Sequence, residues 1–171
     1  LDAGCGNGRN LVYFLRNGFE VYGIDHDPES IRSVIKMAQQ IIPGYPASRF
    51  IKASVEQLPF NDDDFALVIS SAVLHFARNK QHFENMLYEL WRILKPGGFL
   101  FARLASDIGI ENKIHPTGDG KFLLPDGSER YLINESMLVS YTQQLKGKLF
   151  EPIKTTNVQN LRSMTTWCLI K

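Results

Sequence analysis

Strand-like and helix-like segments alternate over about the first hundred residues, and this alternation limits the chain to a small set of folds. Segments rich in β-branched and aromatic residues are predicted strands, at 19–25, 49–54, 65–73 and 99–105. Segments with apolar residues at helical spacing are predicted helices, at 11–15, 31–42 and 83–94. Because strands separated by helices pair in parallel, the sequence predicts an α/β fold with a doubly wound, mostly parallel sheet.

The pattern changes after residue 105. Residues 106–133 are rich in Gly, Asp, Pro and Asn, and we predict an irregular insertion on the substrate side, with a small hairpin around the turn PDGSE. Asn134 is placed to cap a further helix, and the tail predicts two last strands, with an antiparallel strand at the C-terminus. We expect residues 1–171 to form a single domain. The first three residues supply only part of a central strand, so we expect the natural chain to begin before Leu1.

Balanced charge excludes several classes of partner. The chain has 19 Lys and Arg against 18 Asp and Glu, so no broad positive field attracts nucleic acid. It has no apolar run of roughly 18 residues, the length that predicts a membrane span.

Cys5 and Cys168 lie far apart without metal-binding spacing, which predicts no metal site and a reducing, cytoplasmic compartment. We expect a monomer or a homodimer.

The loop at the start of the chain, LDAGCGNGRN, has glycines at positions 4, 6 and 8 directly after strand-like residues. Glycine has no Cβ, so such a loop can turn sharply and bring backbone N–H groups close to a ligand. Ligands of doubly wound sheets bind at the carboxyl ends of the strands, where this loop is expected. A dinucleotide fingerprint needs a third small residue where Arg9 stands, which disfavours a nicotinamide-dependent oxidoreductase.

The glycine loop and the acidic residue at the end of the next strand resemble the class I S-adenosylmethionine (SAM) dependent methyltransferases. Three further segments are similar to that family in order and spacing: YGIDHDPESI, VEQLPFNDDDFALVISSAVLHF and LYELWRILKPGGFLF. Together the four segments cover residues 1–102. The opening residues and the chain length resemble the small bacterial methyltransferases of the type 11, UbiE-like and tellurite-resistance groups. The resemblance implies a Rossmann-like fold, SAM as cofactor, and transfer of its methyl group to a small-molecule acceptor by in-line displacement.

The resemblance also implies which residues bind the cofactor: Asp2, Gly4, Cys5, Gly6, Asp25, His26, Ser54, Val55 and Ser70. The loop of residues 2–6 would hold the amino-acid end of SAM, with Cys5 as a small filler. Asp27 precedes Pro28 at the start of a predicted helix and is therefore an expected N-cap. This assignment leaves Asp25 to accept hydrogen bonds from both ribose hydroxyls.

The remaining cofactor residues are expected around the adenine and the SAM amino group. His26 lines the adenine side or is a solvated turn residue. Ser54 stands where the family commonly has Asp, so its hydroxyl would accept a weaker hydrogen bond from the adenine amino group, beside the backbone N–H of Val55. Ser70, at the end of a predicted strand, is expected near the SAM amino group.

His75 lies just past the end of the predicted strand 65–73, where the transferred methyl group is expected. An imidazole there can remove a proton from an acceptor hydroxyl or amine, and packing beside Leu74 and Phe76 is the alternative. Residues 106–130 are expected to be mobile without the acceptor and to order over it. A SAM-binding module without catalysis is the alternative function, which consumption of SAM would distinguish.

Overall fold

A central sheet organises the computed structural model, which describes all residues from 1 to 171. Its strands are, in chain order, β1 (Asp2–Ala3), β2 (Gly23–Asp25), β3 (Phe50–Lys52), β4 (Phe65–Ser71), β5 (Leu94–Ser106), β9 (Lys148–Leu149), β10 (Lys154–Val158) and β11 (Arg162–Ile170). They lie in the order β10-β11-β5-β4-β1-β2-β3, and β9 pairs with β11. The five strands from β5 to β3 are parallel, whereas β11 runs antiparallel to β5 and β10. The predicted fold class, including the antiparallel C-terminal strand, is confirmed.

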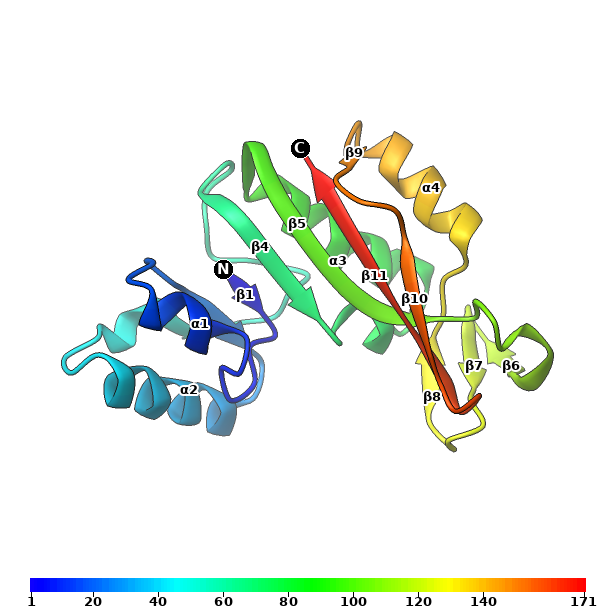
Figure 1. Cartoon of the computed structure of the whole chain (residues 1–171), viewed down its shortest axis with the longest axis horizontal. Helices are drawn as coiled ribbons and strands as arrows, with labels where there is room; N and C mark the ends of the chain where they lie inside the picture. The colour runs from blue at the N-terminus through cyan, green and yellow to red at the C-terminus, as the bar shows by residue number, and fades with distance from the viewer.

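The helices cover both faces of this sheet (Figure 1). They are α1 (Leu11–Arg16), α2 (Pro28–Ile41), α3 (Lys80–Arg92) and α4 (Glu135–Gln144), with short 3-10 turns at Ala47–Arg49, Leu74–Phe76 and Glu111–Lys113. One apolar cluster joins α1 and α2, and a larger one joins α3 and α4. Val21 belongs to the first cluster and Ile24 to the second. An odd spacing places two residues of an extended segment on opposite faces, so the two clusters are separated by the sheet.

Two helix starts agree with the sequence analysis. The Asp27 carboxylate accepts the N–H groups of Glu29 at 3.2 Å and Ser30 at 3.0 Å, and Pro28 follows as the first residue of α2. The Asn134 side chain accepts the N–H of Met137 at 2.8 Å. Both predicted N-caps are therefore confirmed, and Asp27 is committed to the helix.

The insertion is more regular than predicted. It contains a three-stranded antiparallel sheet of β6 (His115–Gly118), β7 (Lys121–Leu123) and β8 (Glu129–Tyr131), of which β7 and β8 form the predicted hairpin. All four residues of β6 are exposed, so no apolar alternation marked it in the sequence. Tyr131 is buried and stacks on Phe83 of α3 with ring centroids 5.2 Å apart, which fixes the small sheet to that helix. Ordering of this segment over an acceptor stays a prediction.

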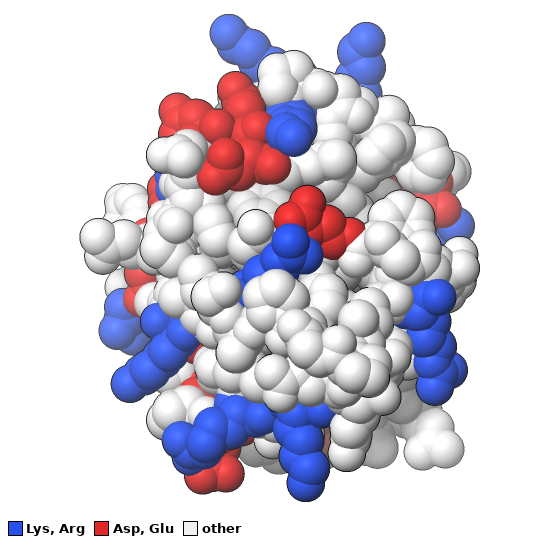
Figure 2. Space-filling model, turned by 90° about the vertical axis from the view of Figure 1, so that its left-hand side faces the viewer, with Lys and Arg blue, Asp and Glu red and all other residues white.

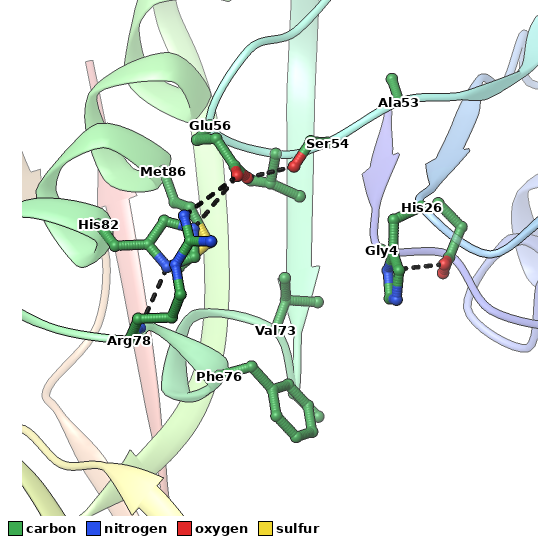
Figure 3. A pocket seen from close by; sticks show the side chains of 13 residues that line it. Gly4, His26, Ala53, Ser54, Glu56, Val73, Phe76, Arg78, His82 and Met86 are labelled. Carbon is green, nitrogen blue, oxygen red and sulfur yellow. Dashed lines mark hydrogen bonds and ion pairs between the residues drawn. The ribbon is translucent and has the colours of Figure 1, made fainter.

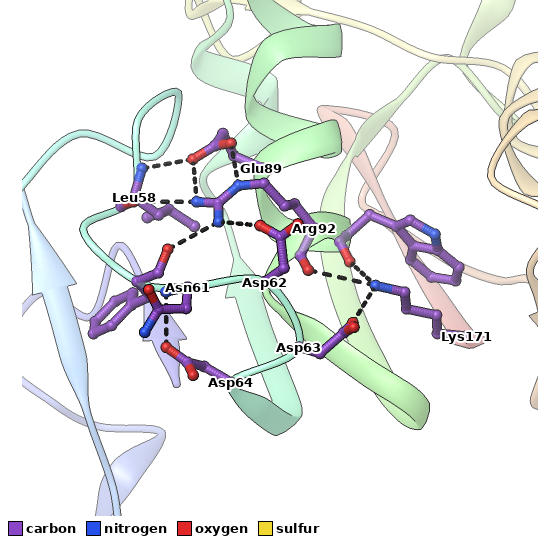
Figure 4. A network of polar contacts seen from close by, with 10 residues as sticks. Leu58, Asn61, Asp62, Asp63, Asp64, Glu89, Arg92 and Lys171 are labelled. Carbon is purple, nitrogen blue, oxygen red and sulfur yellow. Dashed lines mark hydrogen bonds and ion pairs between the residues drawn. The ribbon is translucent and has the colours of Figure 1, made fainter.

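Arg92 at the end of α3 fastens the segment that connects β3 to β4 (Figure 4). Its guanidinium donates to the carbonyl of Phe60 and to Asp62, both at 2.8 Å, and to Glu89 at 2.7 Å. Glu89 in turn accepts the N–H of Leu58 at 2.8 Å. The chain that leaves the carboxyl end of β3 is therefore held against α3 by a network of charged hydrogen bonds.

Charges of both signs share the surface of the molecule. Figure 2 shows basic and acidic residues on the side that carries α1 and α2, with uncharged atoms over much of its centre. This distribution accords with the formal net charge of +1. None of the helices combines the length and apolar character that crossing a bilayer requires.

Candidate cofactor site

A cavity of about 440 Å³ opens at the carboxyl ends of β1 to β4 (Figure 3). Strand order reverses between β1 and β4, which is the place where doubly wound sheets bind ligands. Its volume lies within the range of roughly 300–1,000 Å³ that small-molecule sites occupy. The residues that line it are Gly4, Asp25, His26, Ala53, Ser54, Val55, Glu56, Ala72, Val73, Phe76, Arg78, His82 and Met86. Five of the nine predicted cofactor residues are in this set.

The glycine loop needs its glycines for backbone conformation and for close packing. Gly4 has φ +78°, and a Cβ there would lie 2.4 Å from a methyl carbon of Val73. Gly8 has φ +80°, and a Cβ there would meet Met37 at 2.3 Å and Val34 at 2.6 Å on α2. No L side chain fits either position, so the loop can pass between α2 and the segment that follows β4 only as a glycine loop.

Asp25 joins the glycine loop to the end of β2. One carboxylate oxygen accepts the N–H of Gly6 at 2.9 Å, and the other accepts the N–H of Asp27 at 2.9 Å. The Nδ1 atom of His26 lies 3.3 Å from the same carboxylate. Each carboxylate oxygen has two lone pairs, so the two amides orient the group and leave acceptor capacity toward the cavity. This arrangement suits a ligand with two neighbouring hydroxyls.

The opposite wall of the cavity is also polar (Figure 3). The Ser54 hydroxyl donates to the Glu56 carboxylate. His82 Nδ1 accepts the N–H of Arg78 at 3.1 Å, which places the imidazole proton on Nε2, 3.4 Å from Glu56. Burial favours the neutral acid, but the hydrogen bonds from the Ser54 hydroxyl and a backbone N–H, together with the nearby His82 imidazole, outweigh it and lower the pKa of Glu56. Glu56 is thus an ionised acceptor in the cavity.

Four predicted cofactor residues do not line the cavity: Asp2, Cys5, Gly6 and Ser70. The buried Asp2 carboxylate accepts the Asn10 amide at 3.3 Å; burial raises its pKa to about 7, against the effect of that hydrogen bond. Burial raises the pKa of the Cys5 thiol to about 12, which agrees with a filler rather than a nucleophile. The Ser70 hydroxyl is fully buried without a hydrogen-bond partner.

His75 lies in the 3-10 turn after β4 and is buried. Its Nδ1 accepts the N–H of Ala105 at 3.0 Å, so the neutral ring carries its proton on Nε2. Burial, and then the positive charges of Arg130, Arg103 and Arg162, lower the pKa of His75 to about 4. This geometry makes His75 a hydrogen-bond donor and argues against the predicted role as a general base.

Comparison with known proteins assigns the chain to a family. Residues 1–102 match the family described as "Methyltransferase domain". The chain belongs to this methyltransferase family. The predicted membership is therefore confirmed, and over the same residues that carry the four motifs.

Individual relatives of this methyltransferase-domain chain are longer proteins. It is 35% identical over 114 residues to the uncharacterized methyltransferase YodH of Bacillus subtilis, a match that covers 65% of this chain and 42% of that protein. It is 33% identical over 108 residues to malonyl-[acyl-carrier protein] O-methyltransferase of Enterobacter lignolyticus, covering 63% of this chain and 39% of that protein. The matched region is thus about two fifths of the length of these relatives.

Solved structures share the fold at low sequence identity. A SAM-dependent methyltransferase from Methanosarcina mazei superposes with a TM-score of 0.78 at 21% identity, covering 99% of this chain and 90% of that chain. The 1,6-didemethyltoxoflavin-N1-methyltransferase of Burkholderia thailandensis superposes with a TM-score of 0.73 at 17% identity, covering 99% and 69%. These similarities extend the fold assignment beyond residue 102 to the C-terminal strands.

Several lining residues were missed by the sequence analysis. Glu56 had a signal, because it stands two residues after Ser54 in the motif expected at the adenine. Arg78 and His82 had no such signal. Arg78 lies between β4 and α3, and His82 lies in the first turn of α3, where charged residues are ordinarily solvated. Phe76 was considered only as a packing neighbour of His75, yet it lines the cavity.

Proposed function

We propose that this chain binds SAM in the cavity at the carboxyl ends of β1 to β4 and transfers its methyl group to a small-molecule acceptor. The observation that carries the proposal is the Asp25 carboxylate, held by the amides of Gly6 and Asp27 with acceptor capacity facing the cavity. A carboxylate in that position binds a vicinal diol by charge-assisted hydrogen bonds. The family match supports the same chemistry.

The lining residues fit the parts of SAM. Asp25 would bind the ribose, and the apolar side chains of Val55 and Met86 would contact the adenine faces. The adenine amino group would donate to the carboxylate of Glu56, which is a stronger acceptor than the Ser54 hydroxyl alone. The loop at Gly4 would hold the amino-acid end of SAM.

SAM, when bound, supplies an electrophilic methyl group on a positively charged sulfur, which becomes a neutral thioether. The protein therefore has no leaving group to protonate, and its main task is alignment. Holding two reactants in attack geometry accounts for about 7–11 kcal/mol of a barrier. Ala72 and Phe76, which line the cofactor cavity, also line a neighbouring cavity, so the acceptor would approach from that side.

We further propose that the enzyme is bacterial and cytoplasmic. It would act as a monomer or a homodimer and would have no nucleic acid as a partner. The two cysteines are free thiols, which suits a reducing compartment. Several of the similar proteins, including those of Bacillus and Enterobacter, are bacterial.

The proposal is tested by adding the protein and SAM to a cell extract and searching by mass spectrometry for metabolites that gain a methyl group. We expect S-adenosylhomocysteine to accumulate with at least one methylated product. Calorimetric titration should show binding of SAM and none of NADH. Tight binding of SAM without S-adenosylhomocysteine from any acceptor would instead identify a non-catalytic SAM-binding module.

A further inference from the structure

A second cavity of about 270 Å³ lies next to the cofactor cavity and shares Ala72 and Phe76 with it. Its walls come from the end of β5, the small sheet and the β10–β11 hairpin, which are distant in sequence. The sequence motifs of the family end at residue 102, before most of these walls. The second cavity is therefore a feature that the family match does not describe.

Three arginines line this cavity: Arg103 from β5, Arg130 from β8 and Arg162 from β11. The Arg103 guanidinium is half-buried and has no hydrogen bond or ion pair with any other side chain. Arg130 lies over the ring of Phe76 at 4.8 Å and donates only to the carbonyl of Glu129. The one acidic lining residue, Asp126, lies 3.8 Å from Arg162. Two guanidinium groups are thus left without an acidic partner.

His75 adds a further donor to the same wall. Its Nδ1 is occupied by the N–H of Ala105, and its Nε2–H has no partner in the protein. Guanidinium groups and this imidazole all donate hydrogen bonds, and a guanidinium accepts none. Partly buried charges without partners are unfavourable until a ligand of opposite charge pairs with them. The lining is therefore complementary to a group that only accepts hydrogen bonds and carries negative charge.

We infer that the second cavity binds an oxyanion, a carboxylate or a phosphate, of the methyl acceptor. The inference rests on the proposed function, since it names the substrate class of the same enzyme. The guanidinium group of arginine matches both oxyanions, because two of its parallel N–H groups donate hydrogen bonds to two oxygens. The shared residues Ala72 and Phe76 place the rest of an anchored acceptor at the border of the cofactor cavity. The acceptors are accordingly small acids rather than neutral molecules.

The test is an NMR titration of the full chain with benzoate, inorganic phosphate and the neutral benzamide, at constant ionic strength. We expect saturable shifts of the Arg103 side-chain Nε–H and His75 ring signals with benzoate or phosphate, and none with benzamide. Whichever of the two anions binds identifies the oxyanion. In Arg103→Gln we expect the dissociation constant of that anion to rise about tenfold or more, the effect of one charged hydrogen bond.

Arg32→Gln is the matched control, because Arg32 is an exposed residue of α2 that pairs with Glu29 and lines neither cavity. It should change anion affinity by less than about twofold, as expected for a screened surface charge. SAM affinity, measured by calorimetry, should be unchanged in both variants. If Arg103→Gln does not fold, Arg130→Gln repeats the test at the second guanidinium group without an acidic partner.

The outcomes separate the two proposals. Anion binding that is equal in Arg103→Gln and Arg32→Gln, or no stronger than binding of benzamide, overturns the inference even if SAM binds normally. Saturable anion binding that depends on Arg103 supports the oxyanion site. Failure of the wild-type chain to bind SAM overturns the proposed function and is recorded in a separate titration.

Discussion

At the scale of single residues, Asp25 and Asp27 show how identical side chains two positions apart acquire different tasks. Asp27 accepts the first amides of α2, so its carboxylate is used by the fold. Asp25 accepts one amide on each oxygen and lines the cofactor cavity, so its carboxylate is oriented without being saturated. The order Asp-His-Asp-Pro was sufficient to make this distinction from sequence, because only Asp27 can cap a helix that starts at Pro28.

The first prediction follows from that distinction. Asp25→Ala should weaken SAM binding by about 1.5–3 kcal/mol, because it removes hydrogen bonds to a charged group. Asp27→Ala should lower the free energy of unfolding by about 0.5–2 kcal/mol through loss of the N-cap, with little change in SAM affinity. Calorimetry measures the affinities, and urea denaturation measures the stabilities. An Asp25→Ala protein that binds SAM as tightly as the wild type would remove Asp25 from the site.

The second prediction concerns the pH dependence of stability through His75. Its pKa falls from 6.5 to about 4 on folding, so the unfolded chain binds more protons between those values. Stability from this group is therefore present above pH 6.5 and is lost as the pH falls toward 4. The loss at about pH 5 is about 2 kcal/mol.

His75→Gln is the comparison for this effect, because its amide oxygen can still accept the N–H of Ala105 while the side chain does not titrate. We expect urea unfolding at neutral and mildly acidic pH to show a smaller loss of stability in the variant than in the wild type. Equal losses in the two proteins would mean that His75 titrates normally in the folded chain.

At the scale of elements, the connection between β3 and β4 depends on one side chain of α3. Arg92 donates to two carbonyls and one carboxylate of that connection and to Glu89 of its own helix. The segment it holds follows directly on the cavity residues 53–56. Such a network positions backbone that has no regular hydrogen bonding of its own.

The third prediction is that Arg92→Leu lowers the free energy of unfolding by about 1–3 kcal/mol, because the partly buried carbonyls of Leu58 and Phe60 and the Glu89 carboxylate lose a charged donor. Arg32→Leu, which removes an exposed pair on α2, should change it by less than about 0.5 kcal/mol. Urea denaturation of both variants provides the measurement. Equal stabilities for the two would show that the network in Figure 4 contributes nothing.

Elements with strong periodicity were predictable, and those held by tertiary contacts were not. The apolar spacing of α3 and the N-caps of α2 and α4 gave these helices directly from the sequence. β5 begins at Leu94, before the predicted strand at 99–105, since the sequence of Lys95–Gly98 indicates only the end of a helix. In the structure, Gly97 N–H pairs with the carbonyl of Lys171, a partner that only the assembled sheet supplies.

The scale of the whole molecule explains why five of the nine cofactor residues expected from the sequence line the first cavity, whereas the second cavity was not predicted. Ligand residues at the switch point lie directly after successive strands, so their order in the chain reports their place in space. Arg103, Arg130 and Arg162 come from two different sheets and meet only because β11 returns antiparallel beside β5. No local sequence pattern indicates that these three side chains lie around one cavity.

The proposed function places the cofactor and the acceptor at neighbouring parts of the molecule. The candidate cofactor cavity lies between the half that carries α1 and α2 and the helix α3, and the opposite end, with β6 to β8, would complete the acceptor side (Figure 1). Phe76 and Ala72 are common to both cavities and mark where the methyl group would pass. Acceptor specificity is therefore expected to reside after residue 102.

The most direct test of the central claim is a crystal structure of the chain soaked with S-adenosylhomocysteine. We expect the nucleoside in the cavity between Gly4 and Met86, with both ribose hydroxyls within hydrogen-bond distance of the Asp25 carboxylate. Ligand density elsewhere, or a ribose bound without contact to Asp25, would contradict the account.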